Sequence, residues 1–480
     1  MDIFEQIKGI IAGIGKEKNP DKIKLDSTLD GDLGFDSLAA IELIYALENE
    51  FKIKIEDNDF RQIKIKDILN YIESQIKNQP HPLTYIRQSK NQYINSLQVD
   101  KSLAQKIDFN PYYRDIKSGL GARVKIEGRN YISLGSNDYL GLANDKRVKE
   151  GAKKIIDKYG LSMCSTPITL GKTEINRELE QIISSWLKQE DTILFPSCYQ
   201  ANLGAFYSLT ANKDLVIADE GIHSSLINGA LLAGACLKFF PHNDTDKLKE
   251  ALKDTSGYRM RFICIEGLYS INGDIPPLDK ISSLAEEYDA FLIVDDAHGI
   301  GILGDDSQGI SGVFPPDNSI DLISGSLGKA LGVFGGFLSG TAKVIDHLRY
   351  SCPMYFYSTS LPAHIAAAAI SAINIIRSNP KLRKKIFSYK EKLYTSLKNM
   401  GYRLTESQTP LFAILFKDEL QTLKMAKLLS EENIYAVPFI APSVPKESPR
   451  IRLLASACLE DKDIEKVIQV FKKLRFAYAP

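Results

Sequence analysis

The sequence ISGSLGKALG, residues 323–332, places a lysine among glycines directly after a short apolar segment. Glycines at this spacing let the backbone approach a ligand closely, and Ser326 offers a hydroxyl group to a phosphate. A lysine amine in a desolvated pocket forms Schiff bases with carbonyl groups. An isolated lysine is usually a solvated surface residue. Lys329 is a candidate for Schiff-base chemistry because it lies among glycines directly after an apolar segment.

A second motif, VDDAHGIGILG at residues 294–304, ends another apolar strand with Asp295 and His298. Pyridoxal 5′-phosphate (PLP) needs such groups, because an acid keeps its pyridine nitrogen protonated and another polar group holds its phenolic oxygen. A capping acid and an ordinary hydrogen-bonded histidine would give the same pair. The motif alone leaves both interpretations open.

Two more turns carry polar groups. FPSCYQANLGAF, residues 195–206, indicates a strand, a turn and a helix start, where backbone N–H groups cradle a phosphate. DEGIHSSLINGA, residues 219–230, places His223 in a loop with small neighbours. His223 could stack on a cofactor ring, although a lone loop histidine often has no such role.

Short apolar strands alternate with helical stretches from about residue 101 onward. The strands are DTILFP (191–196), DLVIAD (214–219), RFICIEG (261–267), AFLIVDDAH (290–298) and DLISGS (321–326). This alternation predicts an α/β fold with a mostly parallel sheet and helices on both faces. Ligands bind at the carboxyl ends of such strands, where Ser270, Asp295 and Lys329 stand. A Lys-rich helix and short strands after about residue 376 predict a smaller C-terminal subdomain, 376–480.

The first 78 residues read as a separate small helical bundle. Within it, LGFDSLAAIELIYALENEF (33–51) predicts an amphipathic helix that begins near Ser37. Its predicted apolar stripe consists of Leu38, Ile41, Ile44, Tyr45 and Leu47. The region is acid-rich, which is usually only a solvated face. A linker at 79–100, with two prolines, separates this bundle from residues 101–480.

Composition excludes several classes of protein. Lys plus Arg and Asp plus Glu number 60 each in 480 residues, which argues against a nucleic-acid binder or polybasic membrane protein. The longest apolar run, HIAAAAISAINII (364–376), is too short to span a bilayer and predicts a buried helix. Scattered cysteines and histidines, without a CxxC or HExxH motif, predict no metal site and no disulfide framework. With an acidic start unlike a signal peptide, these features favour a reducing cytoplasm.

The motifs occur in the order found in the α-oxoamine synthases. They are LGSNDYLGL, FPSCYQAN, DEGIHSSLINGA, EGLYSINGDIPPL, VDDAHGIGILG, GSLGKALG and YSTSLP. Residues 101–480 resemble this PLP family, which includes 8-amino-7-oxononanoate synthase and serine palmitoyltransferase, and which has PLP fold type I. Residues 1–78 resemble an acyl carrier protein. Ser37 would then carry 4′-phosphopantetheine; the alternative is a serine that only caps its helix.

The resemblance implies a role for each cofactor residue. Lys329 would form the Schiff base with PLP and then remove the Cα proton. Asp295 would pair with the pyridine nitrogen, His298 would bond the phenolic oxygen, and His223 would stack on the ring. The other cofactor residues implied are Cys198 and Tyr199 at the phosphate turn, Ser326 on the phosphate and Ser270 near the cofactor.

The resemblance also implies substrate and partner contacts. Arg452, in PRIRLLAS, matches the arginine that holds the amino-acid carboxylate, and Asn137 lies at the substrate mouth. Thr359, in YSTSLP, matches the residue that reaches the partner subunit's phosphate, which implies a homodimer with a shared active site. A phosphopantetheinyl transferase and an acyl-loading enzyme are further implied partners.

The implied reaction is a decarboxylating condensation of a small L-amino acid with an acyl thioester, giving an α-amino ketone. The fused carrier predicts that the acyl group arrives on Ser37. The sequence departs from the family pattern near the acyl entrance, at Met163, Cys164, Thr166, Asn176, Cys198, residues 305–312 and Cys458. These departures leave the acyl donor and the chain length open, and acyl-CoA is the alternative donor. Aldolase or racemase chemistry, with the carrier holding the amino acid, and a catalytically silent subunit are separate alternatives.

Overall fold

The computed structural model describes residues 3–15, 17–35, 37–51, 53, 55, 64–76, 102–253, 255, 257–314 and 320–478. The chain divides into two compact units, one made of residues 1–109 with 440–447 and the other of residues 110–439 with 448–480. The predicted linker at 79–100 lies outside the described residues.

The first unit is helical, with α1 (Ile3–Ile14), α2 (Ser37–Phe51), α3 (Ile65–Ile76), α5 (Ser102–Ile107) and a short 3₁₀ helix (Pro20–Lys22). Leu43 and Leu47, one turn apart on α2, are fully buried with Ile7 and Ile72 of the neighbouring helices. The predicted apolar stripe did not include Leu43, which is fully buried, and it did include Ile44, which is only partly buried. Ser37 opens α2, and its side chain lies outside the described atoms.

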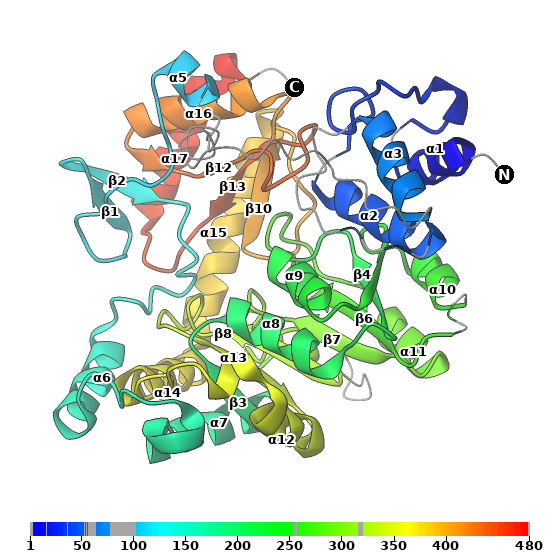
Figure 1. Ribbon diagram of the computed structural model, residues 1–480. Coiled ribbons are helices and arrows are strands. Elements are labelled where there is room, and N and C mark those ends of the chain that lie inside the picture. The colour runs from blue at the N-terminus through cyan, green and yellow to red at the C-terminus, as the bar shows by residue number, and fades with distance from the viewer. Residues whose placement is uncertain are drawn as a thin grey trace, which may run out of the picture. The chain divides into compact units, whose positions relative to one another are not determined.

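The second unit is built on a seven-stranded sheet with the order β3-β9-β8-β7-β6-β4-β5. Its strands are β3 (Asp191–Phe195), β4 (Leu215–Asp219), β5 (Cys236–Phe240), β6 (Arg261–Glu266), β7 (Phe291–Asp295), β8 (Leu322–Ser326) and β9 (Gly336–Gly340). All neighbours pair in parallel except β9, which is antiparallel to both β3 and β8. The predicted mostly parallel sheet with helices on both faces is confirmed (Figure 1).

Alternate strand residues enter two hydrophobic clusters, one on each face of the sheet. One face is covered by α8 (Cys198–Leu209), α9 (Ser224–Leu232) and α12 (Ala342–Ser351). The other is covered by α7 (Glu174–Leu187), α10 (Thr245–Lys253), α11 (Leu278–Glu287) and α14 (Ala363–Ser378). The apolar run at 364–376 is thus a core helix. The connections add α6 (Lys146–Tyr159), α13 (Pro353–Phe356), a π-helix (Pro167–Gly171) and a 3₁₀ helix (Ile310–Gly312).

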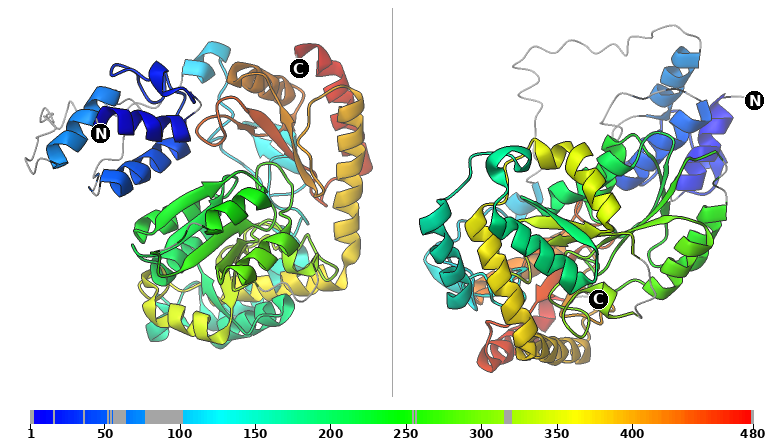
Figure 2. Two further views of the ribbon diagram at one scale, coloured as in Figure 1. Left: turned by 90° about the vertical axis from the view of Figure 1, so that its right-hand side faces the viewer. Right: turned by 90° about the horizontal axis from the view of Figure 1, so that it is seen from below.

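Two small sheets complete this unit. One joins β1 (Arg123–Ile126), β2 (Arg129–Ser133) and β11 (Ile434–Tyr435); the other joins β10 (Leu411–Leu415), β13 (Arg450–Leu454) and β12 (Pro438–Phe439). They lie with α16 (Glu419–Glu431), α17 (Asp461–Lys473), a 3₁₀ helix (Leu474–Ala477) and α15 (Pro380–Asn399). The long helix α15 packs beside α17, as Figure 2 shows. Because β11 pairs with β2, the C-terminal elements are tied to the start of the unit.

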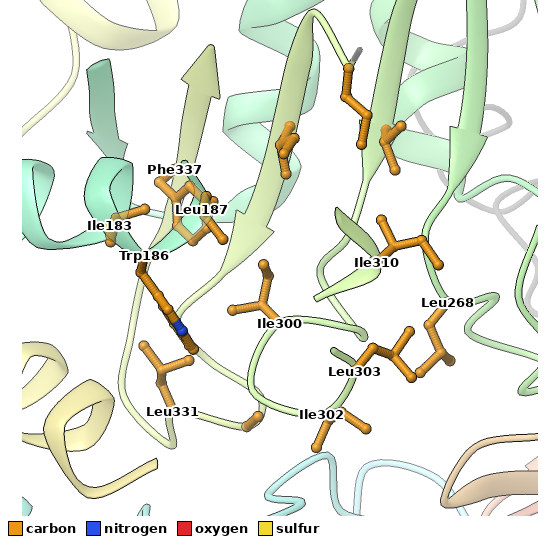
Figure 3. Packing of buried hydrophobic residues seen from close by; sticks show 14 of the residues in the cluster. Ile183, Trp186, Leu187, Leu268, Ile300, Ile302, Leu303, Ile310, Leu331 and Phe337 are labelled. Atoms are coloured by element: carbon orange, nitrogen blue, oxygen red, sulfur yellow. The ribbon is translucent and has the colours of Figure 1, made fainter. Parts of the chain in front are cut away.

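The turn that follows β7 is supported by the core. Ile300, Ile302 and Ile310 from this turn are buried in the same cluster as Trp186 of α7 and Leu331 (Figure 3). The Trp186 indole Nε1–H also donates to the carbonyl of Asp306 at 2.9 Å. This packing fixes the backbone on either side of the candidate residues at the ends of β7 and β8. No helix in the described ranges is long and apolar enough to cross a membrane.

Candidate active site

A cavity of about 410 Å³ lies at the carboxyl ends of the central strands, beside the N-terminus of α8. Eight of the predicted cofactor residues line it: Cys198, Tyr199, His223, Ser270, Asp295, His298, Ser326 and Lys329. These residues are spread over 132 positions of sequence, and the parallel sheet brings them together. The cavity therefore forms where a parallel sheet is expected to bind its ligand.

Asp295 ends β7 and is buried, with three donors around its carboxylate. The Asn202 side-chain amide donates to Oδ2 at 2.7 Å, and the backbone N–H of Ala297 donates to Oδ1 at 3.0 Å. The Cys198 Sγ lies 3.8 Å from Oδ1. A buried carboxylate held in this way is oriented to pair with a cationic ring nitrogen.

Lys329 is half-buried in the cavity, three residues after β8. Burial lowers the pKa of its amine, against the opposing charges of Asp295, Cys198 and Glu266. A lowered pKa increases the neutral, nucleophilic fraction of the amine at a given pH. The structure thus gives Lys329 the property that Schiff-base chemistry requires.

His298 is buried, and burial lowers the pKa of its imidazole well below the usual value. Its Nδ1 lies 2.8 Å from the hydroxyl of Tyr139. Burial also raises the pKa of Tyr139, so its hydroxyl keeps its proton and can donate a hydrogen bond to Nδ1 in the imidazole tautomer that is protonated on Nε2. The neutral imidazole then carries its own proton on Nε2, where it can donate to a cavity oxygen.

His223 is the N-cap of α9, where its Nδ1 accepts the backbone N–H of Ser225 at 3.2 Å. The Ser225 hydroxyl lies 2.8 Å from the same nitrogen and accepts the Asn202 amide at 2.9 Å. Burial lowers the pKa of His223. Asn202 therefore orients both Asp295 and, through Ser225, the imidazole of His223.

Arg452 on β13 bonds two other predicted residues. Its Nη1 donates to the carbonyl of Ser270 at 2.9 Å, and its Nη2 donates to Oδ1 of Asn137 at 3.0 Å. The guanidinium also lies 4.8 Å from the ring centroid of Phe439. Ser270 lines the cavity, so these bonds place a guanidinium fork next to the cofactor residues.

Two glycine-rich segments form the remaining wall, at the predicted phosphate turn. Cys198 and Tyr199 occupy the first turn of α8, and a side chain at Gly336 would come within 2.3 Å of the Cys198 nitrogen. The Ser326 hydroxyl accepts the backbone N–H of Gly328 at 3.1 Å. Thr359 is exposed and does not line this chain's cavity.

Three residues that the sequence did not single out support the site: Asn202 and Glu266 line the cavity, and the Tyr139 hydroxyl bonds His298. Asn202 and Tyr139 lie inside the quoted motifs FPSCYQAN and LGSNDYLGL, and that was the available signal. Glu266 faces Asp295 across the parallel pair β6–β7. Its Oε2 accepts the Ser270 N–H at 2.9 Å, while Oε1 is buried without a hydrogen-bond partner.

Replacing Glu266 with glutamine should change how stability depends on pH. Burial and then the charge of Asp295 raise the pKa of Glu266 to about 8 from its ordinary value of 4.5. Between these pH values the folded chain holds a proton that the unfolded chain lacks, so its stability falls as pH rises. In the PLP-free protein, the melting temperature of Glu266→Gln minus that of the unsubstituted chain should increase from pH 5 to pH 8.

The exposed Glu286 on α11 provides the matched control for this measurement. Glu286→Gln should give the same melting-temperature difference at both pH values. A Glu266→Gln difference that stays flat or shrinks toward pH 8 would contradict a protonated Glu266.

The donor set fits PLP. The cavity offers an oriented carboxylate, a neutral histidine, a lysine with a lowered pKa and a helix N-terminus, which match the ring nitrogen, phenolic oxygen, aldehyde and phosphate. Together with the mostly parallel sheet, these groups define a PLP-dependent enzyme of fold type I.

The chain belongs to the aminotransferase class I and II family, whose model matches residues 129–471, and within it to the α-oxoamine synthases. It is 32% identical over 385 residues to the 8-amino-7-oxononanoate synthase of Thermoanaerobacter pseudethanolicus, covering 79% of this chain and 98% of the relative. It is 35% identical over 387 residues to 8-amino-7-oxononanoate synthase 2 of Bacillus subtilis, with the same coverage. Residues 5–72 match the phosphopantetheine attachment site model.

Solved structures give the same family. The serine palmitoyltransferase of Sphingomonas wittichii superposes with a TM-score of 0.75 at 26% identity, covering 78% of this chain and 95% of that one. A serine palmitoyltransferase from S. paucimobilis also gives a TM-score of 0.75, at 25% identity. The protein is accordingly a PLP-dependent acyltransferase that carries a phosphopantetheine attachment domain, and its cofactors are PLP and 4′-phosphopantetheine.

Proposed function

We propose that the protein condenses a small L-amino acid with an acyl group carried on the phosphopantetheine of its own Ser37. The amino-acid Cα loses its proton and forms a carbon–carbon bond with the thioester carbonyl, while the carbon–sulfur bond breaks and the thiol leaves. The carboxylate then departs as CO2, and a proton returns to Cα. The product is an α-amino ketone. The observation that carries this proposal is the convergence of Lys329, Asp295, His298 and His223 on one cavity.

Each side chain of the cavity has a separate role in the proposed reaction. PLP, when bound, withdraws electrons from the bonds at Cα, and Asp295 supports this by pairing with the ring nitrogen. Lys329, with its lowered pKa, would accept the Cα proton, and His298 would donate from Nε2 to the phenolic oxygen. His223 would cover one face of the ring. Ser326 and the first turn of α8, at Cys198 and Tyr199, would hold the phosphate.

Two features support delivery of the acyl group by the fused carrier: the presence of the carrier domain and its net negative charge. Residues 1–76 contain 16 Asp and Glu against 10 Lys and Arg, so the rest of the chain carries the compensating positive charge. Tethering replaces a bimolecular encounter by an effective concentration on the order of millimolar. An acyl-CoA donor is the alternative, and the departures from the family pattern near the acyl entrance favour the tethered donor.

We also propose a homodimer in which Thr359 reaches the partner subunit's phosphate. Thr359 is exposed on its own chain, and its neighbours Tyr350 and Tyr357 have exposed fractions of 74% and 78%. Large exposed side chains of this kind mark interaction surfaces. The further partners proposed are a phosphopantetheinyl transferase and an acyl-loading enzyme, and the location proposed is the cytoplasm.

An amino-acid panel tests the proposed reaction. The PLP absorbance should change saturably with one or two of glycine, L-alanine and L-serine. With the acyl-loaded carrier, the same amino acid should then release CO2 and a free thiol in equal amounts. Turnover without CO2 release would support aldolase or racemase chemistry instead, and protein that never acquires PLP absorbance would support a silent subunit.

Replacing Arg452 with alanine should weaken amino-acid binding. The guanidinium is positioned as a fork by Ser270 and Asn137, and such a fork binds a carboxylate bidentately. The KM for the amino acid should rise roughly 10- to 100-fold, the loss expected for a charge-assisted hydrogen bond. Steady-state kinetics measure it. The exposed Arg129 on β2, replaced by alanine, is the control, and an unchanged KM in Arg452→Ala would exclude the proposed carboxylate site.

A further inference from the structure

A partly buried Asp–His–Asp bridge lies outside the cavity and has no part in the steps above. Asp219, at the end of β4, accepts from Nδ1 of His242 at 2.8 Å, and Asp274 accepts from Nε2 at 2.8 Å. Asp219 is fully buried. Burial opposes a charge on His242, but hydrogen bonds with Asp219 and then Asp274 outweigh it and raise the pKa of His242 to about 10.

One end of the bridge holds the turn that carries His223. The Asp219 Oδ1 also accepts the backbone N–H of Gly221 at 2.7 Å, and its Oδ2 accepts the N–H of Asn243 at 2.7 Å. These bonds fix residues 219–223, which connect β4 to the N-cap of α9. The position of the His223 ring follows from this turn.

The other end holds the loop that carries Ser270. Asp274 accepts from His242 and from the Asn243 amide, both at 2.8 Å, and its backbone carbonyl closes the loop by accepting the N–H of Tyr269. The Tyr269 ring packs edge-on against His242, with centroids 4.3 Å apart. Within this closed loop, the Ser270 carbonyl is the group that accepts from Arg452 at 2.9 Å.

The same loop is fastened to the C-terminal elements. The hydroxyls of Ser407 and Thr409 each donate to the carbonyl of Gly273 at 2.8 Å. Gly273 has φ of +82°, and a side chain there would come within 1.9 Å of the Leu411 carbonyl oxygen. The loop therefore joins the large sheet to β10. On the large-sheet side it is attached by the ionic bridge and by the hydrogen bond that the Ser270 N–H donates to Glu266.

We infer that the Asp219–His242–Asp274 bridge is a positioning device that couples the turn carrying His223 to the loop carrying Ser270, and so sets the orientation of Arg452 for the amino-acid carboxylate. This inference rests on the proposed role of Arg452. None of the three bridge residues touches the cavity, so they act through Ser270 and His223 and not on the substrate.

The test is Asp274→Ala, which cuts the bridge at its loop end and leaves the buried Asp219–His242 pair intact. The dissociation constants of glycine, L-alanine and L-serine, read from PLP absorbance, and the KM of the accepted amino acid should rise at least about 10-fold, as for a lost charge-assisted hydrogen bond. The kcat and the absorbance of the amino-acid-free enzyme should stay unchanged. A merely structural role would lower the melting temperature without this split between KM and kcat.

Two variants complete the experiment. Asp274→Asn keeps an oxygen that accepts from His242 and should restore most of the amino-acid affinity, and it decides the question if Asp274→Ala fails to fold. Asp279→Ala, an exposed acid on α11, is the matched control. If Arg452→Ala weakens amino-acid binding and both Asp274 variants leave it unchanged, the inference is overturned. If Arg452→Ala also leaves the affinity unchanged, the proposed carboxylate site itself is wrong.

Discussion

Replacing Ser37 with alanine should abolish turnover with carrier-bound acyl groups. Ser37 begins α2 in the region that matches the phosphopantetheine attachment site, and an attachment serine needs exposure and not activation. Without its hydroxyl, a transferase has no atom to modify, so the acyl group has no tether. Intact-protein mass spectrometry after incubation with a phosphopantetheinyl transferase and acyl-CoA should show the modified mass in the unsubstituted chain and no modification in Ser37→Ala.

The catalytic unit of this variant provides the internal control. A small soluble acyl thioester, supplied in excess, should still be condensed by Ser37→Ala, because the cavity at Lys329 is untouched. Ser27→Ala, in the same helical unit, should be modified and active like the unsubstituted chain. If Ser37→Ala retained full activity under carrier-loading conditions, the donor would be free acyl-CoA and the carrier would have another role.

The chemistry at the strand ends could be predicted because it is local in sequence. Asp295 ends one apolar strand, His298 lies three residues after it and Lys329 lies three residues after another, and a parallel sheet brings such ends to one edge. The strand β9, GFLSG, was missed because glycine disfavours strands, yet all five of its residues are buried. Gly336 is needed where the strand approaches the turn at Cys198, and Gly340 where it approaches the Asp321 carbonyl.

Contacts between segments that are distant in sequence could not be predicted from the sequence in this way. Tyr139 reaches His298 across 159 positions, and Arg452 reaches Ser270 across 182. The spacing of apolar residues does not show which loops contact one another, because those contacts depend on how the sheet and the C-terminal elements pack. Glu266 looked like an ordinary strand residue, and only its register with Asp295 reveals two carboxylates side by side.

Replacing Lys329 with alanine should cause the largest loss within the catalytic unit. The lysine combines two tasks, covalent attachment of PLP and proton transfer at Cα, and among the described residues no other amine lines the cavity. Removing a general base alone costs roughly 10²- to 10⁴-fold, so turnover should fall by at least that factor. PLP should still bind through Asp295, His298 and the phosphate turn, and equilibrium dialysis should detect it.

Borohydride reduction gives a readout that does not depend on turnover. In the unsubstituted chain it should fix PLP to the peptide containing Lys329, and peptide mapping should find the label there. The exposed Lys343 on α12, replaced by alanine, should leave both label and activity unchanged. Label on another lysine, or appreciable turnover in Lys329→Ala, would show that a residue other than Lys329 is the base. Burial in this cavity lowers the pKa of Lys329, which favours the neutral amine that Schiff-base formation requires, so the label is expected on this residue.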